Sequence, residues 1–271
     1  MRKSILVLSL VATLAAGAAW AQPYPPNAEG VTMGHWHLNM RDSDAARKIF
    51  VAMGGKAVKA GQADVIEIPG VVIRFMNPGT PAPTAGTTGS VINHVGFMVK
   101  DVPSTFEKWK AAGVPVVPGN NGRKDQLYVN MPDGLRIEIL EDKTQAMPIR
   151  NEHVHFSVTE AEIPKMQAWY AKTFGGKAYN RESDKAPVVD IPGVQLRFAK
   201  SDAKNPTTKG RVLDHIGFDV KNLQAFLKKF EADGGKIARP YTKNEQANTA
   251  LAFIYDPWDT YIELNERPTT R

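Results

Sequence analysis

The sequence predicts an α+β protein made of four copies of one unit, each a strand, a helix and about three further strands. One observation is a duplication, because residues 66–75 (IEIPGVVIRF) recur as residues 189–198 (VDIPGVQLRF). Another is that all six histidines lie in four short segments in which apolar and other residues alternate, as in strands. A helix-like stretch follows each segment; the four are GHWHLNM (34–40), INHVGFMV (92–99), EHVHFSV (152–158) and LDHIGFDV (213–220).

The first 21 residues have the pattern of a signal peptide. Met1-Arg2-Lys3 precede an apolar run from Ile5 to Ala19, and the Ala19-Trp20-Ala21 triplet is typical of a cleavage site. The run is shorter than the roughly 18 residues that a spanning helix needs, which favours export over anchoring. We therefore expect a periplasmic or secreted protein that begins near Gln22, with no membrane partner.

Composition restricts the chemistry. The sequence contains no cysteine, so it can form no disulfide, and any metal site must use nitrogen and oxygen donors. The formal charge of +6 includes Arg2 and Lys3, which leaves about 6 − 2 = +4 after cleavage. Basic and acidic residues are interspersed, which argues against a nucleic-acid partner and is compatible with a small, anionic substrate.

Further matches between the two halves keep the same order along the chain. Gly54–Ala57 match Gly175–Ala178, and His94–Phe97 match His215–Phe218. We therefore predict a first domain at residues 30–145 and a second at 150–267. A fainter repeat divides each half again, because histidines recur after 94 − 35 = 59 and 215 − 153 = 62 residues.

Capping residues and glycines delimit two of the expected helices. Asp101 can cap a helix in which Val102, Phe106 and Trp109 share one face, and Gly113 would end it. Asn222 can cap the equivalent helix in the second half, with an apolar face followed by a glycine stop; its residues are Leu223, Phe226, Leu227, Phe230 and Gly234-Gly235. Turn signals such as Pro69-Gly70 and Pro192-Gly193 then separate the short strands.

The last strand of each half carries one acid among apolar residues, as Ile137-Glu138-Ile139 and Ile262-Glu263-Leu264. Because side chains alternate along a strand, each glutamate faces away from its apolar neighbours. If that face is the concave interior of a sheet, the carboxylate must be paired, hydrogen-bonded or bound to a metal.

The repeated units and the late Pro132-Asp133-Gly134-x-x-Ile137-Glu138 resemble the vicinal oxygen chelate superfamily, over roughly residues 30–267. This group includes glyoxalase I, extradiol dioxygenases, and fosfomycin- and bleomycin-resistance proteins. The resemblance implies two tandem domains with curved, mostly antiparallel half-barrel sheets. It also implies a divalent metal held by two histidines and a glutamate, and the matching positions are His35, His94 and Glu138 in one half and His153, His215 and Glu263 in the other.

Within this resemblance several points stay open. The sheets can close within a half or between halves, so His35 can join His94 and Glu138, or His215 and Glu263. A two-histidine, one-carboxylate set leaves positions for substrate oxygens, and the metal can be Fe²⁺, Zn²⁺ or Mn²⁺. Both sets are complete, as in a fused pseudo-dimer, and the chain is expected to be a monomer or a homodimer.

Four further residues are candidates for catalytic roles. His37 and His155 lie two residues after His35 and His153 and face the same way, as extra ligands, orienting residues or general bases. Arg74 and Arg197 stand where glyoxalase I resemblance calls for a fourth ligand, a glutamate. Their planar guanidinium groups could donate paired hydrogen bonds to an anionic substrate or to the triad carboxylate. Alternatively, these arginines could lie on the outer face of the sheet. Aromatic and polar residues are candidates for a pocket mouth: Tyr128, Asn130, Tyr255, Trp258 and Tyr261.

The leading functional hypothesis is an exported metalloenzyme that chelates two neighbouring oxygens of a small substrate. Ring-cleaving oxygenation of the extradiol type fits the ligand set best, with isomerase or lyase chemistry through an enediolate as the close alternative. A metal-free binding protein of the bleomycin-resistance type is the hypothesis from another class, and periplasmic metal storage or delivery is a third.

Overall fold

The computed structural model describes residues 24–267, and the predicted signal peptide at residues 1–21 lies outside them. The first half of the chain forms two units of the predicted order. The first is β1 (Val31–Leu38), α1 (Ser43–Ala52), β2 (Lys56–Ala60), β3 (Ala63–Ile68) and β4 (Val71–Phe75). The second is β5 (Ile92–Val99), α2 (Val102–Ala111), β6 (Val116–Pro118), β7 (Gln126–Asn130) and β8 (Arg136–Glu141), with short 3₁₀ turns η1 (Asn120–Gly122) and η2 (Pro132–Gly134).

The second half repeats this order. The third unit is β9 (Ile149–Val158), η3 (Glu160–Glu162), α3 (Ile163–Phe174), β10 (Lys177–Asn180), β11 (Pro187–Ile191) and β12 (Val194–Lys200). The fourth is β13 (Leu213–Val220), α4 (Leu223–Ala232), β14 (Lys236–Asn244), β15 (Thr249–Tyr255) and β16 (Tyr261–Glu266). The predicted α+β class and the strand-helix-three-strand unit are confirmed.

The helices begin at the predicted caps. The Asp101 carboxylate accepts from Ser104 N at 2.7 Å and the Asn222 side chain accepts from Ala225 N at 2.9 Å, which satisfies backbone donors in the first turns of α2 and α4. In α3 a proline stands in the first turn and the helix ends at Gly175, whose φ of 65° is left-handed. Within residues 24–267 no helix is both long and apolar enough to cross a membrane.

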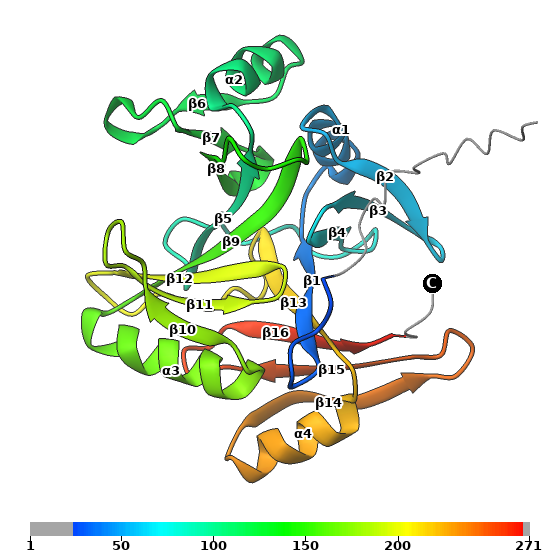
Figure 1. The fold of residues 1–271 in the computed structure, drawn as a ribbon. Coiled ribbons are helices and arrows are strands. Elements are labelled where there is room, and N and C mark those ends of the chain that lie inside the picture. The colour runs from blue at the N-terminus through cyan, green and yellow to red at the C-terminus, as the bar shows by residue number, and fades with distance from the viewer. Residues whose placement is uncertain (1–23, 268–271) are drawn as a thin grey trace, which may run out of the picture.

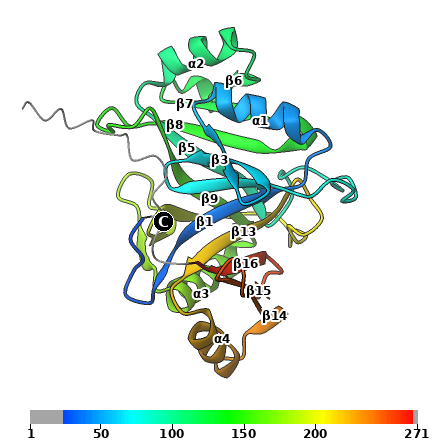
Figure 2. The same cartoon turned by 90° about the vertical axis from the view of Figure 1, so that its right-hand side faces the viewer.

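The strands form two eight-stranded sheets, and each sheet takes one unit from each half of the chain (Figures 1 and 2). Sheet A has the order β14-β15-β16-β13-β1-β4-β3-β2, and sheet B has the order β10-β11-β12-β9-β5-β8-β7-β6. At the centre of each, two first strands pair antiparallel, β1 with β13 and β5 with β9. The last strand of each unit then lies parallel to its first strand. Of the two closures left open by the sequence, the structure has the one between halves, while the boundaries at 30–145 and 150–267 stay a prediction.

Apolar side chains hold the two sheets and the helices together. Trp36 of sheet A stacks on Phe97 of sheet B with ring centroids 4.9 Å apart, and both are fully buried. Phe174 of α3 lies 4.5 Å from Phe218 of β13, so a helix of the third unit packs on the first strand of the fourth. Because side chains alternate along a strand, these apolar residues occupy one face of the central strands and the histidines occupy the other.

Candidate metal centres

A β-bulge precedes the first histidine of every unit. In sheet A the register passes from Met33–Phe218 to His35–Gly217, which leaves Gly34 as an extra residue, and from His37–His215 to Leu38–Leu213. Sheet B has the same two irregularities. Bulges re-aim side chains next to functional sites, and the four extra residues are Gly34, Asn93, Asp214 and Glu152.

Two glycines make room for the first histidines of the odd-numbered units. The ring of His35 lies over Gly217, where an added Cβ would fall 2.1 Å from Cε1 of the ring. The ring of His153 lies over Gly96 with the same 2.1 Å separation. The glycine of the His-x-Gly sequence in the second and fourth units therefore makes room for the histidine ring of the neighbouring strand.

The sheet A site consists of His35, His37, His215 and Glu263. Glu263 Oε2 lies 3.2 Å from His35 Nε2 and 2.9 Å from His215 Nε2. One donor atom from each of the four residues lies within 4.8 Å of the others. His35 is completely buried, and only the His37 side chain is partly open to solvent.

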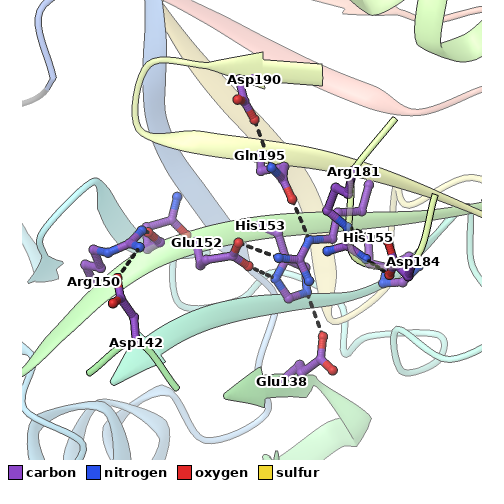
Figure 3. A network of polar contacts seen from close by, with 12 residues as sticks. Glu138, Asp142, Arg150, Glu152, His153, His155, Arg181, Asp184, Asp190 and Gln195 are labelled. Atoms are coloured by element: carbon purple, nitrogen blue, oxygen red, sulfur yellow. Dashed lines mark hydrogen bonds and ion pairs between the residues drawn. The ribbon is translucent and has the colours of Figure 1, made fainter. Parts of the chain in front are cut away.

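The sheet B site consists of His94, Glu138, His153 and His155. Glu138 Oε2 lies 3.2 Å from His94 Nε2 and 3.1 Å from His153 Nε2, while His155 Nδ1 lies 3.0 Å from His94 Nε2. The donor atoms again lie within 4.8 Å of one another. Figure 3 shows Glu138 of β8 pointing to the ring of His153, with His155 on the same strand. The six predicted ligands are therefore grouped between halves and not within each half, and His37 and His155 join the two clusters.

Comparisons with known proteins agree with this architecture. Residues 153–264 match the model of the Glyoxalase/Bleomycin resistance protein/Dioxygenase superfamily. This match covers less than half of the 271 residues, so it is the second half of the chain that is similar to this superfamily. The fold shared with the solved structures described next extends across most of the chain.

Two solved structures illustrate the shared fold. Glyoxalase I from Zea mays superposes with a TM-score of 0.66 at 17% identity, covering 87% of this chain and 92% of that one. A putative dioxygenase from Bacillus subtilis subsp. subtilis str. 168 gives a TM-score of 0.62 at 11% identity, covering 92% and 87%. At these identities the likeness concerns the fold alone.

One relative by sequence is the "probable trivalent organoarsenical cleaving enzyme" of Bacillus subtilis (strain 168). It is 28% identical over 120 residues, which cover 42% of this chain and 76% of that protein.

The bulge residues contact the far nitrogens of three histidines. Asp214 Oδ1 lies 2.6 Å from His215 Nδ1, Asn93 Oδ1 lies 2.9 Å from His94 Nδ1, and Glu152 contacts His153 Nδ1. The fourth bulge residue is Gly34, and among the described residues His35 Nδ1 has no hydrogen-bond partner. An acceptor at Nδ1 holds the proton there, so the Nε2 lone pair of each contacted histidine is directed into its site.

Amide side chains orient both glutamates. Asn265 Nδ2 donates to Glu263 Oε1 at 2.6 Å in sheet A. In sheet B the same oxygen of Glu138 accepts from Gln126 Nε2 and, at 3.3 Å, from the Tyr128 hydroxyl. The second oxygen of each carboxylate is thereby left to face the histidines.

Arg197 acts through a second residue. Its guanidinium, only 8% exposed, pairs with Glu152. Glu152 in turn contacts the ring of His153 (Figure 3). Arg197 Nε also donates to Gln195 Oε1 at 2.9 Å. Arg197 is therefore buried. It neither pairs with the triad carboxylate Glu138 nor lies on the outer face of the sheet, which were two of the roles predicted from the sequence. Arg74 is half-buried and lies beside His37 in the parallel ladder, as Arg197 lies beside His155.

Burial keeps most of these histidines neutral. It lowers the pKa of His35 to about 3 and those of His37 and His94 to about 4, and it lowers the pKa of His155 as well. Burial also acts to lower the pKa of His215, but Asp214 and Glu263 outweigh it and raise this pKa above its ordinary value.

The carboxylates are ionised at neutral pH. Burial acts to raise the pKa values of Glu138 and Glu263, but hydrogen bonds and charge from the histidines outweigh it and hold both pKa values well below the ordinary range. In the same way His153 and Arg197 hold the pKa of Glu152 at about 2.

The donor sets fit a divalent ion. In His215 and His94 the Nε2 lone pair faces a carboxylate oxygen at 2.9 and 3.2 Å, and two acceptors at that distance need a proton or a cation between them. Donor atoms at adjacent positions around an ion with bonds of about 2.1 Å lie roughly 3.0 to 3.4 Å apart, which is close to the observed separations. Neutral imidazoles and a carboxylate are suitable donors for Fe²⁺, Zn²⁺ and Mn²⁺ alike.

Sequence reasoning missed the supporting residues. Glu152 and Asp214 directly precede a histidine, and Gly96 and Gly217 follow one by two residues, so both signals were present in the repeats. Of the residues suggested for a pocket mouth, Tyr128 reaches the site, whereas Trp258 Nε1 donates to Glu162 at 3.0 Å in another part of the molecule.

Proposed function

We propose that the protein is an exported, metal-dependent enzyme that chelates two neighbouring oxygens of a small, anionic substrate. One site would use His35, His215 and Glu263, and the other would use a matching set from sheet B, namely His94, His153 and Glu138. The convergence of these donor atoms around one carboxylate oxygen in both sheets is the observation that supports the proposal. A bound divalent ion would supply Lewis acidity to the substrate oxygens.

The protein's own residues would prepare each site for this role. Asp214 and Glu152 hold the Nδ1 protons of His215 and His153, so that Nε2 is the nitrogen that faces the site and would bind the ion. Asn265 in sheet A, with Gln126 in sheet B, fixes the orientation of the glutamate. Burial excludes water from the ligands, which strengthens electrostatic interactions inside the site.

Two reaction types are compatible with this arrangement. Extradiol-type oxygenation would use Fe²⁺ with three open positions, and isomerase or lyase chemistry would use Zn²⁺, Mn²⁺ or Fe²⁺ to stabilise an enediolate-like charge. The substrate of the organoarsenical relative is not carried over, because trivalent arsenic is a soft centre that prefers sulfur and this sequence has no cysteine.

The first test is the metal content of protein secreted or released from the periplasm, purified without a metal-affinity tag. We expect an N-terminus near Gln22 and about two metal equivalents per chain. His94→Ala and His215→Ala should each lose one equivalent, because each removes a ligand from a different sheet. Tyr241→Phe, which removes a hydroxyl from a residue outside both clusters, is the control and should keep both.

Two results would contradict the proposal. A parent protein that contains no metal and gains no thermal stability from zinc, manganese or iron(II) would leave the metal-free binding protein as the better hypothesis. Recovery of the unprocessed chain from the cytoplasm alone would contradict export.

A further inference from the structure

The second histidine of the His-x-His pairs lies inside each ligand cluster. His37 stands directly opposite His215 in the antiparallel ladder, and their ring centroids are 4.6 Å apart. His155 stands opposite His94 in the same way at 4.4 Å. These separations are shorter than those between the first histidines and the same rings, which are 5.7 Å for His35 and 5.3 Å for His153.

The donor atom of the second histidine in sheet B lies close to two other donor atoms of its cluster. In sheet B the Nδ1 atom of His155 lies 3.0 Å from Nε2 of His94, which in turn lies 3.2 Å from Glu138 Oε2. Because Asn93 holds the Nδ1 proton of His94, the His94 Nε2 atom is an acceptor toward both neighbours. A cation that serves His94 and Glu138 therefore lies within reach of His155 as well.

The same arrangement occurs in both sheets, which supports metal ligation by the second histidine rather than chance packing. Both sheets place the second histidine at the same ladder position, with an arginine beside it on the parallel strand, Arg74 or Arg197. In both sheets its donor atom falls within 4.8 Å of the three other donors. The bulges and glycines that position the first histidines thus bring the second ones into the same cluster.

We propose that His37 and His155 are the fourth protein ligands, so that three imidazoles and one carboxylate hold each centre. This inference rests on the proposed metal function and narrows it. Four protein ligands would leave two positions on a six-coordinate ion, where a triad would leave three. Two substrate oxygens would fill both and leave none for dioxygen, so the site would suit isomerase, lyase or other non-oxidative chemistry on a bidentate oxygen ligand.

The test counts coordinated imidazoles at one site at a time. His94→Ala/Glu138→Ala leaves only the sheet A site, and His215→Ala/Glu263→Ala leaves only the sheet B site. Each protein is loaded with Co²⁺, and proton NMR records the strongly shifted, solvent-exchangeable imidazole N–H signals, one for each coordinated histidine. We expect three signals per site.

Replacing the second histidine identifies the third signal. His37→Phe in the sheet A protein and His155→Phe in the sheet B protein keep a ring but remove the donors, so two signals should remain. Co²⁺ affinity should fall by about tenfold or more, because loss of an outer hydrogen-bond partner alone costs that much. Phe253→Leu, which alters another ring 5.2 Å from His215 but no donor, is the matched control for sheet A.

The outcomes separate this inference from the proposed function. Three signals that fall to two on substitution support the fourth ligand. The count in the single-site protein that still has its second histidine is informative even if the Phe variant fails to fold. Two signals before and after substitution would overturn the fourth ligand and leave the triad intact. Failure of both single-site proteins and of the parent to take up Co²⁺ would overturn the metal function itself.

Discussion

The two candidate sites have the same ligands in different surroundings. In sheet A the bulge residues are Gly34 and Asp214, so a carboxylate contacts His215 and His35 Nδ1 has no partner among the described residues. In sheet B they are Asn93 and Glu152, so both first histidines are contacted, and Arg197 neutralises the Glu152 carboxylate. The difference teaches that the two sites share their clustered histidines and glutamate but not the residues that contact them.

The walls of the two sites differ as well. Phe253 of sheet A stacks on Tyr261 at 4.7 Å, and the Lys209 ammonium lies over the Tyr261 ring at 4.5 Å. The residue of sheet B that faces its glutamate in the same ladder position is Tyr128, whose hydroxyl also accepts from Asn120 at 3.0 Å. Sheet A thus has two stacked rings at its wall and sheet B one ring with a hydrogen-bonded hydroxyl, and we expect the two sites to differ in ligand preference.

The largest expected difference concerns Arg197. Arg197→Met leaves the buried Glu152 carboxylate without its cation, which should reduce the free energy of unfolding by about 3 kcal/mol. Urea unfolding of this variant checks the loss, and an unchanged free energy of unfolding would contradict the role of the pair. Arg197→Met/Glu152→Gln should recover part of the loss.

The pH dependence of stability should carry the next largest difference. The pKa of Glu152 is about 2 in the folded protein against an ordinary 4.5, so its stabilisation is complete above about pH 4.5 and is lost as the pH falls toward 2. The size is on the order of 3 kcal/mol. Glu152→Gln should therefore flatten the fall in stability between pH 5 and 3, as measured by urea midpoints. An unchanged slope would show that Glu152 does not titrate in this way.

The smallest expected effect concerns the tyrosine and phenylalanine that face the two glutamates. Tyr128→Phe removes the hydroxyl that donates to Glu138 and should cost about 1 kcal/mol of stability. It should change the metal affinity of the sheet B site only. The equivalent residue of sheet A is Phe253, which has no hydroxyl. Isothermal titration of the two single-site proteins measures the change, and an equal shift in sheet A would contradict the assignment.

The local features of the fold could be predicted because they depend on neighbours in sequence. The unit order follows from alternation and turn signals, and the caps Asp101 and Asn222 act on backbone donors three residues ahead. Glu138 and Glu263 were expected to be buried and partnered, since each stands alone between apolar strand residues, and the structure confirms this.

Pairing between units could not be predicted from the sequence. His35 is equally compatible with His94 or His215 as a partner, because both lie in a His-x-Gly strand of the same pattern. The Arg197–Glu152 pair joins residues 45 positions apart on neighbouring strands, and only the bulge at Glu152 turns that side chain toward His153. Such contacts depend on register, which the repeat itself does not specify.

The exchange of units between halves has a consequence for the order in which the sites form. Glu263 and His35 are 228 residues apart, whereas the sheet B contacts of His94 with Glu138 and His155 span 44 and 61 residues. Closing a longer loop costs more chain entropy, and long-range strand pairing slows folding. The sheet B site can therefore assemble while the last unit is still emerging, and the sheet A site waits for β16, so the two clusters would form in a fixed order.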